Sequence, residues 1–536
     1  MNFLKRISLL SCTLILCLLL GLAACAKPAP PDVPQRAIRY AIAGAWDSLM
    51  PYGSVSGSNY ARIIYDKIYD RPAFIHADGT LSPRAATSWE TLEDGYALRF
   101  MLDERTRFHD GTPVTAQHWL ETFQIVTNPL CHILGRSTFS VLTGTDEAGA
   151  LIAGETLGVT VQDVYTFTLH LKKPMTAQDF LLGYGRELYL LPTHMMRELS
   201  AEDWLESDFW RTPVGSGPCV FENEVVGSSL SLRASTVYQF GCDGFDRLEI
   251  QVIDKANHLS ALLSGDIDYF AFGNAVSGDN LAFAEAQGLT VVKSDAYTNF
   301  FELMLNNESL SDANLRKAID LAIDKNRLAD YNAGDLGVVA ESYLLPGTVY
   351  PSLLSALWSY DVLAAQQYFA DSTYGGETLT LATTAPRSGL AALMQQDLAA
   401  VGIDVAIVTV DSAALFSGMA AGDYDMALAS HTPSALPLWF VEPRFTVDGG
   451  VFRTQDENFR LLIGDVSSSV TEQERASAMV RLLSYLNQET PFVPLFFTKL
   501  AYAESETVSG IEYTASSFSN ENVWAWEKQS WRDEQP

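Results

Sequence analysis

The chain has 536 residues, and its 65 acidic residues against 35 Lys and Arg give it a formal net charge of −30. Hydrophobic residues make up 48% of it and charged residues 19%, which fits a globular protein with a large core and excludes a disordered or collagen-like one. The length predicts more than one domain, and the acidic excess disfavours nucleic acid as a partner.

Residues 1–25 have the layout of an export signal, with two basic residues, an uninterrupted apolar run and small residues before Cys25. The alternative is an uncleaved transmembrane anchor, because residues 7–24 approach the roughly 18 apolar residues that begin to span a bilayer. The ending Leu22-Ala23-Ala24-Cys25 resembles the lipobox of bacterial lipoproteins. That resemblance implies removal of residues 1–24 as a signal peptide and lipidation of Cys25.

Residues 25–36 then form the lipidated cysteine and a proline-rich tether, suited to spacing a folded body from an anchor. A body this acidic is repelled by anionic headgroups, so the attachment to the membrane would come from acyl chains. The sequence therefore predicts an extracytoplasmic protein, anchored by lipid to the cell membrane, at the cell surface or in the periplasm.

Three further cysteines, Cys131, Cys219 and Cys242, lie in the body of the chain. An exported compartment permits a disulfide, and Cys219 and Cys242 flank a predicted hairpin, but buried free thiols are the other reading. The sequence alone does not decide the connectivity.

The first half of the body has the alternating pattern of antiparallel strands. We expect strands at residues 96–102, 166–171, 219–225 and 229–234, and a helix near residues 115–126. Residues 37–270 therefore form a β-rich half.

The second half alternates strands with helices. A strand at residues 378–381 precedes a helix that ends at Gly402, a strand at 403–407, a helix between Asp411 and Gly422, and a strand at 425–429. This order predicts an α/β lobe with a largely parallel sheet.

Two longer helices flank this lobe, at residues 311–330 with Ser311 as N-cap, and at residues 471–488 behind a capping box that starts at Thr471. The apolar residues 490–497 contain Pro491 and Pro494, which favours an edge strand or a crossover over a central strand.

Several strings resemble, in order, segments of the peptide-binding lipoproteins of ABC importers, within the family of extracytoplasmic oligopeptide-, dipeptide- and nickel-binding proteins. The similarity covers roughly residues 37–515. The strings are Trp46-Asp47-Ser48-Leu49-Met50-Pro51, the segments 81–90 and 108–116, Gly215-Ser216-Gly217-Pro218, and the segments 315–325 and 397–403.

The resemblance implies an α/β fold of the periplasmic-binding-protein type II, with two lobes, a ligand cleft between them and an inserted domain. Lobe I would comprise residues 37–80, 211–285 and 494–536, the β-rich inserted domain residues 81–210, and lobe II residues 286–493. The implied function is to capture a peptide or similar small polar ligand, without a cofactor, and deliver it to an ABC permease as a monomer.

Catalytic and metal-binding motifs are missing from the sequence, so we expect a receptor and not an enzyme. The string His109-Asp110-Gly111 is typical of a turn, and Gly215-Ser216-Gly217-Pro218 of a close approach between backbones near a hinge. A surface hydrolase remains a remote alternative, although no residue can be nominated for it.

Clefts for solutes combine aromatic walls with a few polar groups. The loops that resemble the family's cleft edge supply the candidate ligand contacts, although core packing is the alternative for each aromatic side chain. These candidates are Trp46, Tyr52, Tyr297, Asn299, Arg387, His431 and Trp439.

The sequence departs from the family after residue 429. Many peptide binders have a Trp there, followed by an Asp that pairs with the α-ammonium of the peptide, whereas this chain has Ser430-His431-Thr432-Pro433 and no acid in the stretch. Either Glu442 substitutes, or the ligand lacks a free amino end. The departure also leaves open a surface peptide sensor or chaperone-like receptor that works without transport.

Overall fold

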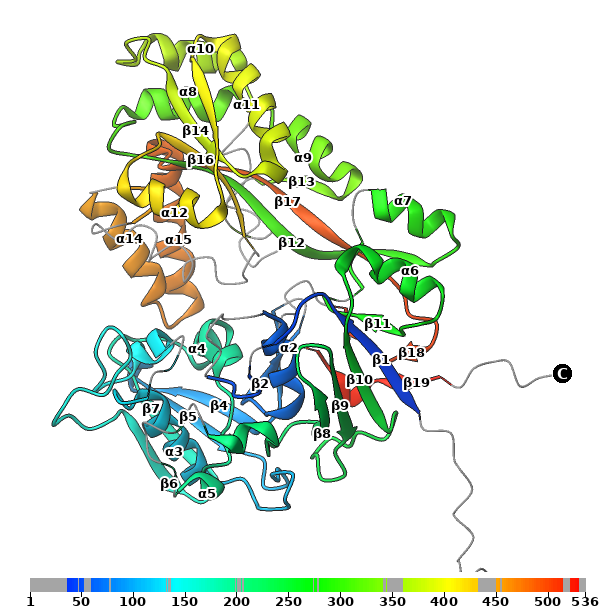
Figure 1. Cartoon of the computed structure of the whole chain (residues 1–536). Helices are drawn as coiled ribbons and strands as arrows, with labels where there is room; N and C mark the ends of the chain where they lie inside the picture. The colour runs from blue at the N-terminus through cyan, green and yellow to red at the C-terminus, as the bar shows by residue number, and fades with distance from the viewer. Residues whose placement is uncertain are drawn as a thin grey trace, which may run out of the picture.

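A computed structural model describes residues 36–529, except 47, 53–58, 77–78, 132, 134–135, 198, 200–203, 205–206, 273, 277–278, 341–343, 345–359, 432–449, 454–455 and 514–520. Figure 1 shows two bodies: one is built on a six-stranded sheet, and the other contains a five-stranded and a four-stranded sheet. We call the parts around these sheets lobe II, lobe I and the inserted domain. Within the described ranges, no helix combines the length and apolarity needed to cross a bilayer.

Lobe I is built on a sheet with the strand order β11-β1-β10-β9-β8. The strands predicted at 219–225 and 229–234 are confirmed as the antiparallel pair β8 and β9, and β1 runs parallel to β10. The elements of lobe I are β1 (Ala37–Ile42), α2 (Asn59–Ile68), β2 (Ala73–Ile75), β3 (Leu81–Pro83), β8 (Cys219–Val225), β9 (Ser229–Ala234), β10 (Arg247–Val252), α6 (His258–Leu263), β11 (Tyr269–Phe270), α7 (Asp279–Ala286), β18 (Val508–Ser509) and β19 (Glu527–Lys528).

The inserted domain is an antiparallel sheet with the order β4-β5-β7-β6, covered by α3. Thr115 caps α3 in a capping box with His118. One hydrophobic core runs from this sheet into lobe I, so the two parts form a single packed body. Its elements are β4 (Ala86–Leu92), β5 (Ala97–Leu102), α3 (Ala116–Thr127), β6 (Val159–Asp163), β7 (Thr166–His170), α4 (Ala177–Tyr184) and α5 (Thr193–Met196).

Lobe II has the strand order β13-β17-β12-β16-β14-β15, with separate cores on its two faces. The sheet is mixed and not largely parallel, because β12 runs antiparallel to β16 and β17. Its elements are β12 (Val291–Leu305), α8 (Ala313–Ala322), α9 (Lys325–Ala333), β13 (Gly337–Val339), α10 (Val362–Ala370), β14 (Leu379–Thr383), α11 (Ser388–Val401), β15 (Val405–Thr409), α12 (Ser412–Ala421), β16 (Met426–His431), α14 (Glu457–Ser467), α15 (Glu472–Glu489) and β17 (Phe492–Ala503).

The single helix predicted at residues 311–330 is wrong, because two helices, α8 and α9, occupy this stretch. Each begins at an aspartate whose carboxylate accepts backbone N–H groups, Asp312 for α8 and Asp324 for α9, so Ser311 is not the N-cap. Asp324 starts a second helix in the middle of this stretch, although the apolar spacing continues across it. The capping box of Thr471 at α15 is confirmed.

β17 lies between β13 and β12, so the edge position predicted for residues 490–497 is wrong. Pro494 is tolerated because β13 pairs only with residues 496–498, and because Pro494 sits at a register shift against β12. The boundary expected at residue 494 therefore falls inside this strand.

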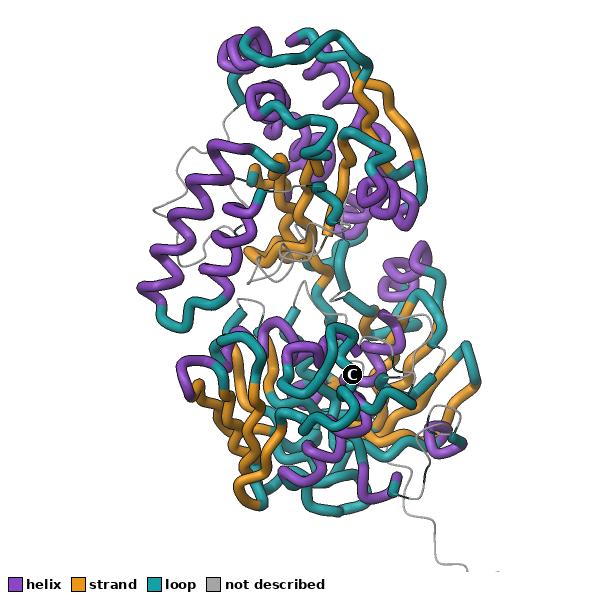
Figure 2. Tube along the Cα trace, turned by 90° about the vertical axis from the view of Figure 1, so that its left-hand side faces the viewer, coloured by secondary structure: helices purple, strands orange, loops and turns teal. Residues whose placement is uncertain are grey.

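The two bodies are joined through the long strands β12 and β17, whose far ends reach lobe I (Figures 1 and 2). There Asn274 Nδ2 donates to the carbonyl of Ala503 at 3.1 Å, and its Oδ1 accepts the N–H of Phe270 at 2.6 Å. Asn274 is fully buried at a positive φ of 51°. We call β12 and β17, which pass from lobe II to lobe I, the connecting strands.

The turn predicted at His109-Asp110-Gly111 and the close backbone approach predicted at Gly215 are both present. Gly111 has a φ of 89° in a turn where the carboxylate of Asp110 accepts the N–H of Thr112 at 2.9 Å. A Cβ added at Gly215 would lie 1.9 Å from the carbonyl oxygen of Ile68, so only glycine fits that approach.

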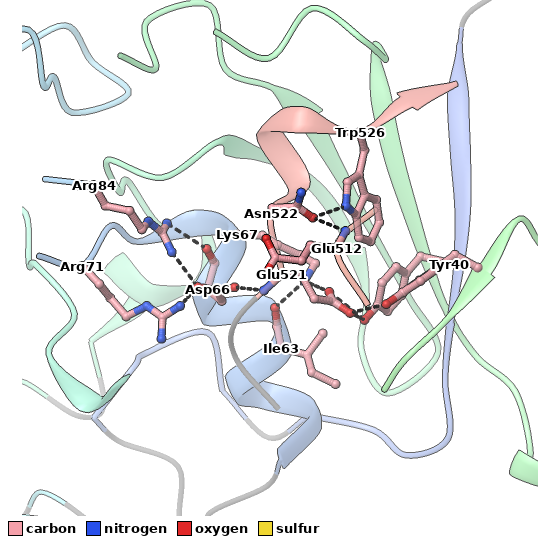
Figure 3. Close-up of polar contacts among 11 residues, drawn as sticks. Tyr40, Ile63, Asp66, Lys67, Arg71, Arg84, Glu512, Glu521, Asn522 and Trp526 are labelled. Carbon is pink, nitrogen blue, oxygen red and sulfur yellow. Dashed lines mark hydrogen bonds and ion pairs between the residues drawn. The ribbon is translucent and has the colours of Figure 1, made fainter. Parts of the chain in front are cut away.

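A buried charge network attaches the C-terminal segment to lobe I (Figure 3). Lys67 donates to Glu521 at 2.5 Å, and the N–H of Glu521 donates to Asp66 at 3.0 Å. Arg71 and Arg84 also pair with Asp66, and all five side chains are almost completely buried. Paired charges and shared hydrogen bonds offset the cost of burying them.

Cys131, Cys219 and Cys242 are buried, and no two of them form a disulfide. Burial raises the pKa of the Cys219 thiol well above its usual value, and a hydrogen bond with Cys242 adds to this effect. The structure therefore has the free-thiol alternative and not the bridge.

Candidate functional site

The carboxyl ends of the parallel strands β14 and β16 form the most promising region for binding. β14 ends at Thr383 and leads through residues 384–387 into α11, and β16 ends at His431. Ligands of open α/β sheets bind outside the carboxyl ends of the strands, where chain directions diverge. Arg387 and His431 lie at this edge on opposite faces of the sheet, because Arg387 contacts Ser430 and the side chain of the next residue points the other way.

Arg387 is held by hydroxyl groups. Its Nη2 donates to Ser430 Oγ at 2.5 Å and its Nη1 to Thr384 Oγ1 at 3.2 Å. The guanidinium carbon lies 5.9 Å from the centroid of the Phe301 ring. Burial lowers the pKa of Arg387, although an arginine remains charged at any physiological pH. A half-buried cation with hydroxyl partners is a suitable anchor for an anionic group.

His431 lies opposite Phe300 on the neighbouring strand β12, with ring centroids 5.1 Å apart. Its Nδ1 is 3.6 Å from Oε1 of Glu302, a carboxylate that is fully buried in the sheet. Phe300 also packs on Phe497 at a centroid distance of 4.8 Å. This end of the sheet thus combines a titratable imidazole, a buried acid and an aromatic wall.

Tyr297 extends this wall, because its ring centroid is 5.4 Å from that of Phe497. Asn299 follows on the same strand, where its amide nitrogen donates to Thr298 Oγ1 at 3.3 Å. Both side chains are partly exposed. The structure therefore gathers four of the expected contacts, Tyr297, Asn299, Arg387 and His431, at one end of the lobe II sheet.

The two lobe I candidates are placed differently. Trp46 is 5% exposed and its indole donates to Glu224, and Tyr52 is 6% exposed. The Tyr52 hydroxyl donates to the carbonyl of Tyr189 at 2.8 Å and accepts its N–H at 2.8 Å. Both belong to the core of lobe I, as the core-packing alternative supposed. Trp439 and Cys25 lie outside the described residues.

Sequence reasoning missed three residues of this region: Ser430, Phe301 and Glu302. An acid inside the apolar string Phe300-Phe301-Glu302-Leu303 was a usable signal, because a charge is rarely buried in a strand without a partner. The contact of Ser430 with Arg387 joins residues 43 positions apart and had no local signal.

Residues 80–449 match the model "Bacterial extracellular solute-binding proteins, family 5 Middle". The chain belongs to this family. A Brucella ovis protein whose name describes an ABC transporter peptide-binding protein is 26% identical over 337 residues, which cover 61% of this chain and 60% of that protein. The dipeptide-binding protein DppE of Bacillus subtilis is 22% identical over 453 residues, 80% of this chain and 81% of DppE.

Solved structures share the fold over a greater length. The ABC transporter substrate-binding protein CtaP of Listeria monocytogenes superimposes with a TM-score of 0.77 at 18% identity, covering 92% of this chain and 99% of CtaP. The match confirms the two-lobed fold predicted from the sequence. The chain is therefore a member of an extracellular solute-binding family with that family's architecture.

Proposed function

We propose that this protein is a lipid-anchored receptor that captures a peptide or a similar small polar solute between its lobes and delivers it to an ABC permease. Membership of the family and the peptide-binding names of the relatives support the receptor role. The string that ends in Cys25 supports the lipid anchor. Hinge-bending receptors suit this task, because they bury a solute when closed and release it when open.

The surroundings of Arg387 indicate which kind of ligand the protein binds. It points a charged guanidinium into the edge formed by β14 and β16, and the partners found for it are Ser430 and Thr384, both neutral. A ligand carboxylate could accept charge-assisted hydrogen bonds from the same group. We therefore propose a ligand that carries a carboxylate, such as the C-terminal end of a peptide.

Calorimetry with three pools of tripeptides tests this proposal: free peptides, peptides with amidated C-termini and peptides with acetylated N-termini. We expect the free and acetylated pools to bind, and amidation to weaken binding about tenfold or more. Arg387→Gln should have the same effect on the free pool, while Arg99→Gln, in an exposed ion pair of the inserted domain, should have none.

The outcomes separate the two parts of the proposal. Equal binding of free and amidated pools would exclude the carboxylate anchor but leave a receptor. Failure of every pool to bind would count against the peptide class itself. The transport-independent sensor is distinguished by uptake: a deletion strain with normal peptide import but a lost response to peptide would favour the sensor.

A further inference from the structure

Lobe II touches the inserted domain at a point far from the connecting strands. The helical hairpin α14–α15 extends from lobe II toward α4, on the opposite side of the molecule from the junction of β12 with lobe I (Figures 1 and 2). Arg475 of α15 pairs there with Asp179 of α4, 296 residues away in sequence. This is a contact between the two bodies, made outside the strands that join them.

The ion pair has the geometry of a strong contact. Arg475 Nη1 donates to Asp179 Oδ1 at 2.9 Å, and Nη2 donates to the second carboxylate oxygen. The side chains are only 20% and 6% exposed, respectively. Bidentate, poorly solvated pairs of this kind are stronger and more directional than pairs on an open surface.

A second contact lies beside the pair. Val470, at the tip of the hairpin, lies so close to Gly95 that a Cβ added to this glycine would be 2.7 Å from Val470 Cγ1. Gly95 has a φ of 92°, and its carbonyl accepts the N–H of Met175 at 3.0 Å. Arg475 also donates to the carbonyl of Ser469 at 3.0 Å, which holds the tip in place. The absence of a side chain at Gly95 thus leaves room for Val470 of the hairpin.

We propose that Asp179 and Arg475 form a latch, and that the arrangement in which α15 contacts α4 is the closed one of the two bodies. Rotation of lobe II about the connecting strands would separate the hairpin from α4, so the ion pair and the contact of Val470 with Gly95 belong to one state only. A contact made in one of two states shifts the population toward that state. Asp179 and Arg475 are therefore positioning residues, which set ligand affinity from outside the Arg387 region.

Pulsed electron paramagnetic resonance tests the latch without any ligand, so its result does not depend on the proposed function. Nitroxide labels on cysteines placed at Val164 in the inserted domain and Leu461 in α14, which are 58% and 60% exposed, report the distance between the bodies. The native thiols Cys131, Cys219 and Cys242 are buried and should stay unlabelled.

We expect wild type to show a short-distance population that Asp179→Asn and Arg475→Gln each reduce about tenfold relative to the longer one. The charge-reversed double variant D179R/R475D should restore part of it, a rescue that mere damage to folding would not show. Arg481→Gln is the matched control, since Arg481 pairs with Asp465 within the hairpin and both side chains are about half exposed.

The latch also predicts a kinetic effect: a bound tripeptide pool should leave D179N about tenfold faster than wild type. Distance distributions that are unchanged in both single variants would overturn the proposal. So would a wild-type distribution that lacks the short population both with and without the tripeptide pool.

Discussion

His109 and Gly215 are joined by reciprocal hydrogen bonds. The N–H of His109 donates to the carbonyl of Gly215 at 2.8 Å, and the N–H of Gly215 donates to His109 Nδ1 at 3.2 Å. The other ring nitrogen, Nε2, donates to the carbonyl of Gly217 at 3.0 Å. The neutral imidazole thus ties the inserted domain to the glycine-rich segment that leads back into lobe I.

His109 makes the stability of this junction depend on pH. Burial lowers the pKa of His109 to about 4, from 6.5. The unfolded state therefore takes up the proton first as the pH falls. The stability contributed by His109 is complete above pH 6.5 and decreases as the pH falls from 6.5 to about 4. Protonation would also break the hydrogen bond from Gly215, because Nδ1 could no longer accept it.

We predict that His109→Asn lowers the free energy of unfolding at pH 7 by about 1–3 kcal/mol, since a shorter amide cannot satisfy the groups of both Gly215 and Gly217. The loss of stability between pH 7 and pH 5 should also be smaller in the variant. Urea unfolding at both pH values measures each effect. His118→Gln is the comparison, because burial also lowers the pKa of His118 to about 4. Equal pH dependence in wild type and H109N would contradict this account.

The buried network of lobe I predicts a large loss of stability when one of its charged side chains is replaced by an uncharged one. Glu521→Gln removes the charge that faces Lys67 in a site from which water is excluded, and should lower the free energy of unfolding by about 3–5 kcal/mol. Asp246→Asn is the control, because Asp246 pairs with Arg36 on the surface and should cost less than about 1 kcal/mol. Similar losses in the two variants would rule out a special role for the network.

The free thiols predict a simple chemical result. Cys131, Cys219 and Cys242 are buried, so an aromatic disulfide reagent at pH 8 should react with none of them in the native protein and with all three after unfolding without reductant. A single reactive thiol after unfolding would show that Cys219 and Cys242 are bridged instead.

Lipidation of Cys25 predicts a change in membrane attachment. Cys25→Ser removes the sulfur that would carry the acyl chains. In a two-phase extraction the variant should therefore move from the detergent phase to the aqueous phase, and its molecular mass should not include the lipid. Conservative replacement of the body cysteine Cys131 by Ser should leave partitioning unchanged. Identical partitioning and mass for wild type and C25S would contradict the anchor.

Local patterns in the sequence predicted those elements well whose hydrogen bonds join residues that are close in sequence. The hairpin of β8 and β9 and the capping box at Thr471 were identified because turn and cap residues sit at fixed spacing from the apolar run. The break at Asp324 was missed because the apolar period continues across it. The position of β17 was missed because the partial cover by β13 is a tertiary feature.

The same distinction between local patterns and tertiary contacts applies to the candidate site. Arg387 and His431 lie near the ends of the strands predicted at 378–381 and 425–429, so their place at one sheet end could be expected. Tyr297 and Asn299 lie inside β12, a strand that was not predicted from the sequence. Trp46 and Tyr52 carry no signal that separates a binding wall from a core, and both proved to be packed in lobe I. The pair of Asp179 and Arg475 depends on how two bodies meet, which no local pattern records.

The most direct test of the central claim is the crystal structure of the protein purified from its native host with whatever solute it retains. We predict electron density for a small polar molecule between the lobes, with a carboxylate oxygen within hydrogen-bond distance of the Arg387 guanidinium. A solute bound away from the space between the lobes, or one that presents a cationic group to Arg387, would contradict it.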